Sequence, residues 1–237
     1  MPAAALFVLL QVAGPPSAEC RDGQLSMVTS IRELLDRGDS DVARTAVTSL
    51  PPETSSCLPL ELARLAVTGW FEARSLAAVG GAVDKQAPVQ AALDQLDKLK
   101  ASAAASPVAA IEIEYAQTIV RAAVSAAQDE RAEMELLLGH ARDLVQRLQS
   151  RSVRAVWPRP YNAAAGELWF EVDRYEEARA AFDRAVQADG SAASLVGLAR
   201  ALARLNRLDE ACAAYSRAVD ASPELRAAAR SDLARCR

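Results

Sequence analysis

Residue types that commonly carry out catalysis are sparse in this 237-residue sequence. Its one histidine, His140, lies in the stretch LLLGHARDL, where we expect a helical, partly exposed side chain. Glu112 and Glu114 stand two residues apart, so a helix would direct them to different faces and they could not act together as acid and base. The strings GxGxxG, GxxxxGKS/T, HExxH and GxSxG do not occur. We therefore expect no enzyme, no cofactor and no metal site.

The four cysteines are better suited to disulfide bonds. Cys20, Cys57, Cys212 and Cys236 form no CxxC pair, so a zinc or thioredoxin-like site has no support. Residues equidistant from the turn of an antiparallel helix pair face each other. We expect one turn midway between the first two cysteines and another midway between the last two. The spacing thus predicts Cys20–Cys57 and Cys212–Cys236 disulfides, which persist in oxidising compartments. The alternative is four buried free thiols.

The N-terminus predicts an exported protein. Its apolar run of about ten residues is too short to span a bilayer but has the length of a signal-peptide core. We expect residues 1–18 to be a cleaved signal peptide, and the mature protein to be periplasmic or secreted without a membrane span. No basic residue precedes the run and Pro16 fits a cleavage site poorly, so a cytoplasmic protein is the alternative. Glu19, directly before Cys20, disfavours a lipid anchor.

The composition is typical of helices. Alanine supplies 52 residues and β-branched residues are sparse. A net charge of −4 argues against a nucleic-acid partner. Proline, glycine and capping residues divide the chain into consecutive antiparallel helix pairs. We expect helices at residues 22–37, 40–50, 58–79, 84–104, 107–127, 129–150, 161–172, 174–188, 191–205, 207–221 and 223–236.

The last third of the chain contains an internal repeat. The stretch YEEARAAFDRAVQADG, from Tyr175, aligns with LDEACAAYSRAVDASP, from Leu208, at an offset of 33 residues. A period of this length indicates stacked helix pairs. Ala178 and Ala185 allow helices to approach closely, while Phe182 fills the space between pairs. The second copy repeats this pattern with Ala211, Tyr215 and Ala218.

Residues 159–223 therefore resemble two tetratricopeptide repeats. The packing positions of that family are occupied by Ala165, Gly166, Trp169, Ala178, Phe182, Ala185 and Gly190 in the first copy, and by Leu198, Ala199, Leu202, Ala211, Tyr215, Ala218 and Pro223 in the second. The resemblance implies an all-α, right-handed superhelical solenoid of antiparallel helix pairs with a capping helix over 223–236. Residues 157–237 would form two repeats plus the cap. Residues 19–156 would be degenerate repeats or a separate helical bundle.

The resemblance also implies a groove lined by the first helix of each pair. It places Glu167, Phe170 and Glu171 on the first repeat and Arg200 and Arg204 on the second. The glutamates and the arginines each form an i,i+4 stripe. The arginines could bind a partner carboxylate, with Phe170 as an apolar anchor. Alternatively, the two stripes neutralise each other. The asparagine and lysine needed by the family's chaperone-tail clamp are missing from their places.

Taken together, these features favour a non-enzymatic protein-interaction scaffold in a cell-envelope assembly, with a protein or peptide partner. A cytosolic adaptor of the same repeat type is one alternative. An all-helical cell-wall-degrading hydrolase, in which the repeats present the substrate, is another. The connector WPRP at residues 157–160 is expected to pack against neighbouring helices.

Overall fold

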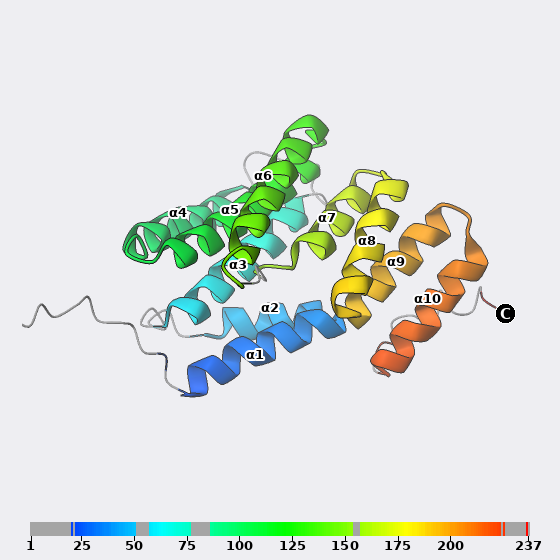
Figure 1. Cartoon of the computed structure of the whole chain (residues 1–237), viewed down its shortest axis with the longest axis horizontal. Helices are drawn as coiled ribbons and strands as arrows, with labels where there is room; N and C mark the ends of the chain where they lie inside the picture. Colours follow the sequence, from blue (N-terminus) through cyan, green and yellow to red (C-terminus); the bar gives the residue numbers. More distant parts are fainter. Residues whose placement is uncertain are drawn as a thin grey trace, which may run out of the picture.

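The chain folds into helices that follow one another in pairs. The computed structural model describes residues 20, 22–50, 57–76, 86–153, 157–223, 225 and 236, and within these it shows ten α-helices and no strand (Figure 1). The predicted all-α class is confirmed. The predicted signal peptide and most of the predicted capping helix lie outside the described residues. The helices are α1 (Asp22–Arg37), α2 (Ser40–Thr48), α3 (Leu58–Ser75), α4 (Ala87–Ser102), α5 (Pro107–Ala127), α6 (Arg131–Gln149), α7 (Tyr161–Glu171), α8 (Tyr175–Asp189), α9 (Ala192–Arg204) and α10 (Leu208–Ala221).

Local sequence explains several helix ends. The Ser106 hydroxyl accepts a hydrogen bond from the Ala109 N–H at the start of α5, and Pro107 occupies the first helical position, where the sequence predicted that a helix begins. Gly190 ends α8 with a positive φ of 63°, a conformation that glycine adopts without steric cost. The short turns at these ends let each helix fold back along its predecessor.

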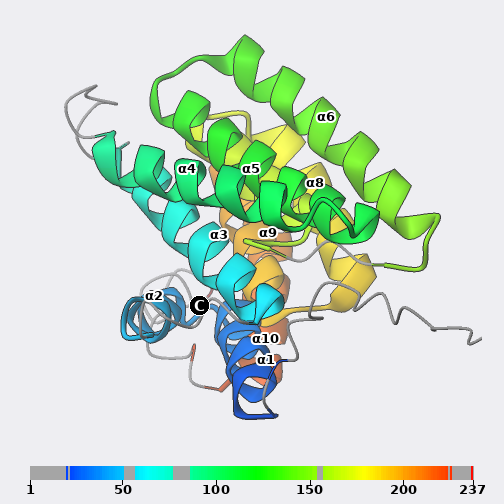
Figure 2. The same cartoon turned by 90° about the vertical axis from the view of Figure 1, so that its left-hand side faces the viewer.

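Each helix packs against its successor in the pairs α1–α2, α3–α4, α5–α6, α7–α8 and α9–α10 (Figures 1 and 2). Further contacts of α3 with α5 and of α8 with α9 join neighbouring pairs. The first pair also meets the C-terminal half, because α1 contacts α9. The right-handed superhelix stays a prediction.

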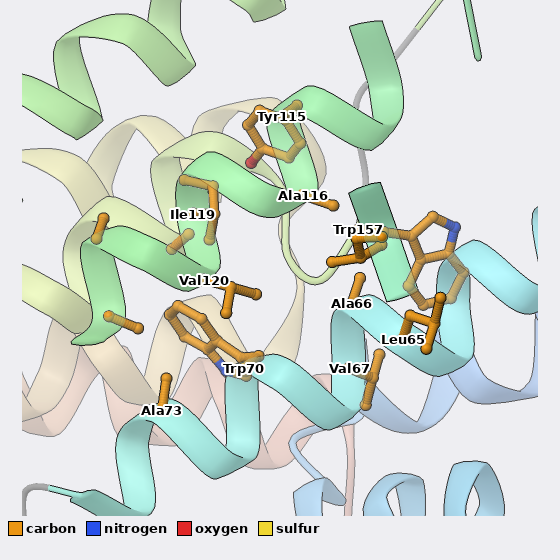
Figure 3. Packing of buried hydrophobic residues seen from close by; sticks show 14 of the residues in the cluster. Leu65, Ala66, Val67, Trp70, Ala73, Tyr115, Ala116, Ile119, Val120 and Trp157 are labelled. Atoms are coloured by element: carbon orange, nitrogen blue, oxygen red, sulfur yellow. The ribbon is translucent and has the colours of Figure 1, made fainter. Parts of the chain in front are cut away.

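The main core is continuous across the predicted boundary at residues 156 and 157. Trp70 of α3 packs with Ile119 and Val120 of α5, and Trp157 of the connector lies among residues of the same cluster (Figure 3). Gly69 permits the close crossing of α3 and α5, since a Cβ there would lie 3.2 Å from Val120. Trp157 is 6% exposed, so the connector packs against helices rather than projecting into solvent.

Phe182 is the centre of packing between the last two pairs. A Cβ on Gly166 of α7 would approach the Phe182 ring to 2.8 Å, and one on Gly197 of α9 would approach it to 2.3 Å. Only glycines therefore fit on either side of this ring. The sequence predicted Phe182 and Gly166 as packing residues but did not single out Gly197.

Candidate functional site

A groove of about 660 Å³ opens between α3, α7 and α9. The turn between α1 and α2 forms one of its walls. Four of the five predicted partner-binding residues line it together, namely Glu167, Phe170, Glu171 and Arg200. The other lining residues are Gly38, Ser40, Phe71, Arg74, Arg159, Asp173, Phe182, Ala193, Val196, Gly197 and Leu225.

The two predicted glutamates share a partner from a distant part of the chain. Arg74, at the end of α3, donates from Nε to Glu171 Oε1 at 2.5 Å and from Nη1 to Glu167 Oε2. Arg159 Nε lies 3.2 Å from Glu167 Oε1. None of the described ion pairs joins Glu167 or Glu171 to Arg200 or Arg204. The described ion-pair partners of the two glutamates are Arg74 of α3 and Arg159 of the connector, while the charge of Arg200 acts on Glu171 from a longer distance.

Burial controls the electrostatics of this cluster. Desolvation raises the pKa of Glu171 despite the opposing charge of Arg74. Desolvation also acts against the charge of Arg74, but the two glutamates outweigh it and raise the pKa of this guanidinium. Glu171 Oε2 is buried and accepts no hydrogen bond from the described residues. Arg74 is therefore needed to keep both carboxylates compatible with burial.

The predicted arginines lie against aromatic rings. Arg200 is 5.2 Å from the ring centroid of Phe170, and Arg204 is 4.4 Å from that of Tyr175. These two rings contact each other edge to face at 5.4 Å. Arg204 does not line the groove but lies 3.8 Å from Asp173, which does. No described carboxylate lies within ion-pair distance of Arg200, although its charge acts from a longer distance to lower the pKa of Glu171 against the effect of burial. The exposed guanidinium of Arg200 can therefore still bind another anion.

Sequence reasoning missed Arg74 and Arg159 as groove residues. Arg159 is 5% exposed, and its Nη1 donates to the Leu35 carbonyl of α1 at 2.7 Å. The Tyr115 hydroxyl in turn donates to the Arg159 carbonyl at 2.6 Å. The prolines on either side of Arg159 indicated a connector between helices. Neither arginine belongs to a local sequence pattern from which its partners, distant in sequence, could be predicted.

The structure places the cysteines at bonding distance in the predicted pairs. The sulfur atoms of Cys20 and Cys57 are 2.16 Å apart, and those of Cys212 and Cys236 are 2.03 Å apart. The corresponding Cα–Cα distances are 4.6 and 5.5 Å.

The other candidate chemical groups are engaged in surface contacts. His140 is half-exposed, and its Nε2 lies 3.1 Å from Glu114 Oε1. Lys100 donates to the other oxygen of Glu114 at 2.9 Å. Among the residues that the structure describes, no group of three or more histidine, cysteine or acidic side chains could hold a metal ion. None of the helices in these ranges is both long and apolar enough to cross a membrane.

Comparison with known proteins supports the repeat architecture over one segment. Residues 192–225 match the family model described as tetratricopeptide repeat. This segment contains α9 and α10, the second of the two predicted copies. No curated protein and no solved structure was found to match the chain.

Proposed function

We propose that this chain is a non-enzymatic protein-interaction module, in which the groove between α3, α7 and α9 binds a partner segment that carries a carboxylate beside an apolar side chain. The observation that supports this function most directly is Arg200, which is exposed, lies over Phe170 and has no described ion-pair partner. The match to a tetratricopeptide repeat over residues 192–225 supports a protein partner.

The charges of the groove favour a carboxylate on the partner. Arg74 and Arg159 are already engaged with Glu167 and Glu171, so these four charges sum to zero. Arg200 can offer two parallel N–H groups along the edge of its guanidinium plane to a carboxylate, while one face of that plane remains over the Phe170 ring. Because this contact is partly electrostatic, the affinity should fall as the salt concentration rises.

The proposed place of action is the cell envelope, after export. Both cysteine pairs lie at bonding distance, which is compatible with an oxidising compartment. Alkylation of the purified, unreduced protein followed by mass spectrometry tests this part. Four alkylated thiols would indicate the reducing cytoplasm instead.

Cross-linking in cells, followed by mass spectrometry of the co-purified proteins, tests the groove. The wild type is compared with an Arg200→Glu/Arg204→Glu variant. The control is Arg121→Glu/Arg217→Glu, which makes the same charge change at exposed positions on α5 and α10. We expect one partner to be lost only from the groove variant, and a synthetic peptide from its cross-linked segment to bind that variant at least about tenfold more weakly.

Two results would contradict the proposal. One is equal recovery of all partners by the groove variant and the control. The other is a peptide whose affinity does not change when its acidic residues are replaced by their amides. Circular dichroism of each variant shows whether the fold is retained.

A further inference from the structure

A second pocket, of about 500 Å³, lies between α6, α8 and the start of α7. It shares no lining residue with the groove. Arg142 comes from α6, Arg184 from α8, and Tyr161 and Asn162 from the first turn of α7. Three helices thus bring these four hydrogen-bond donors to one pocket, which Gln146 and Gln149 of α6 also line.

None of these four donors is used by the residues that the structure describes. The side chains of Arg142, Tyr161, Asn162 and Arg184 form no hydrogen bond with another described residue, and no described carboxylate lies within ion-pair distance of either arginine. Both guanidiniums are close enough to Tyr161 to act against the rise in its pKa that burial produces. The nearby negative charge of Asp143 acts in the opposite direction. The pocket therefore combines two positive charges and the one negative charge of Asp189 with a partly buried phenol hydroxyl.

Two acidic side chains lie near the pocket, but neither forms a described ion pair with Arg142 or Arg184. Asp189 lines it, but its Oδ1 accepts the backbone N–H of Ser191 at 3.0 Å. Asp143 affects Tyr161 electrostatically but is not a lining residue. A ligand with its own oxyanion would thus meet donors that the described part of the chain does not use.

We infer that this pocket binds a small organic anion, through a carboxylate or phosphate group held by Arg142 and Arg184. The Tyr161 hydroxyl and the Asn162 amide supply further donors. The rest of the lining is mixed, with the apolar side chains of Val145, Pro160, Ala185 and Ala188 beside the polar ones of Gln146, Gln149 and Asp189. The volume is in the range of small-molecule sites, about 300–1,000 Å³. A ligand here would bridge α6 and α8, which belong to successive helix pairs.

Thermal unfolding of the full chain tests the site. Inorganic phosphate and succinate are titrated separately, with sodium chloride at matched ionic strength as the reference. We expect at least one of the two anions to raise the midpoint temperature saturably in the wild type, because a ligand that binds only the folded state stabilises it. A response to phosphate alone identifies a phosphate-bearing ligand, and a response to succinate alone identifies a carboxylate.

The key variant is Arg142→Gln/Arg184→Gln. Its matched control, Arg121→Gln/Arg217→Gln, loses the same charge at exposed positions elsewhere. The apparent Kd should rise at least about tenfold in the pocket variant and remain unchanged in the control. Tyr161→Phe, which removes one hydroxyl and preserves the ring, should weaken binding several-fold and provides a second test if the double variant fails to fold. The inference is overturned if neither anion gives a saturable shift, or if the pocket variants and the control respond like the wild type.

Discussion

At the scale of single residues, the groove depends on one guanidinium that serves two carboxylates. Arg74 contacts Glu167 and Glu171, and its guanidinium also lies 5.1 Å from the ring centroid of Trp70. About two-thirds of the Arg74 side chain is buried. Its removal would leave two partly buried negative charges side by side, with Arg159 close only to Glu167.

Replacing Arg74 by alanine should therefore lower the free energy of unfolding by about 2–4 kcal/mol. The triple variant Arg74→Met/Glu167→Met/Glu171→Met should lower the free energy of unfolding much less, because neither glutamate charge then remains buried. Arg159 keeps its hydrogen bond to the Leu35 carbonyl in this variant. Urea unfolding of both variants measures the difference. A single variant as stable as the exposed control Arg121→Ala would show that the glutamates do not need this arginine.

The half-buried Glu112 provides a pH-dependent test. Burial raises its pKa above the ordinary value, so at pH 7 its ionised form is less favourable in the folded chain than in the unfolded chain. This cost disappears as the pH falls through the raised pKa. Glu112→Gln should therefore be more stable than the wild type at pH 7 and equally stable below about pH 4.

Urea unfolding at the two pH values checks this expectation. Glu33→Gln is the control, because Glu33 is exposed and takes part in none of the described ion pairs or hydrogen bonds. An equal difference between Glu112→Gln and the wild type at both pH values would show that the titration of Glu112 is not its cause.

At the scale of helices, the sequence predicted those helix ends and charged stripes that are set by residues close together in the chain. Ser106 and Pro107 fix the start of α5, and α5 ends at residue 127 as expected. Asp129 has a positive φ of 58°, so α6 begins at Arg131 instead of at the predicted residue 129. The acidic and basic stripes could be predicted because they repeat every four residues on single helices. The contacts of Arg74 depend on how α3 and α7 pack, and no local spacing reports that packing.

Replacing glycine by alanine should have opposite effects on stability at two positions, Gly197 of α9 and Gly139 of α6. Gly197→Ala would force a Cβ into the Phe182 ring, and we expect it to destabilise the protein by about 1–3 kcal/mol through overpacking. Gly139 lies inside α6 with open space around its Cβ position, so Gly139→Ala should stabilise by about 0.5–1 kcal/mol. Thermal and urea unfolding compare the two. Similar effects of both substitutions would contradict the packing assigned to Phe182.

At the scale of the whole molecule, helices far apart in sequence share one structure. The main cluster of buried residues extends from α1 to α8, and α1 also contacts α9. The composition and the positions of proline, glycine and capping residues were enough to predict the consecutive helix pairs. The contacts of α1 with α9 and with the connector could not be predicted, because no local spacing indicates that Leu35 lies beside Arg159 or that α1 lies beside α9.

The Cys20–Cys57 bond should stabilise the first helix pair within this structure. The 37-residue separation of these cysteines corresponds to about 3–4 kcal/mol of loop-closure free energy. Cys20→Ser/Cys57→Ser should lose stability of this order, and its remaining response to a reductant should come from Cys212–Cys236. Thermal unfolding with and without dithiothreitol measures both effects. An oxidised wild type as stable as this variant would contradict the expectation.

The hydrogen bond from Arg159 to the Leu35 carbonyl has a consequence for the order in which the protein is assembled. A chain is synthesised from its N-terminus, and Leu35 precedes its partner by 124 residues. The helix pair α1–α2 therefore emerges long before the connector and α9, which α1 contacts in the folded protein. The nearest of its later partners is α3, which contacts both α1 and α2. Docking of the first pair onto the connector must therefore follow the synthesis of residue 159, and a nascent chain that stops before Arg159 cannot complete this contact.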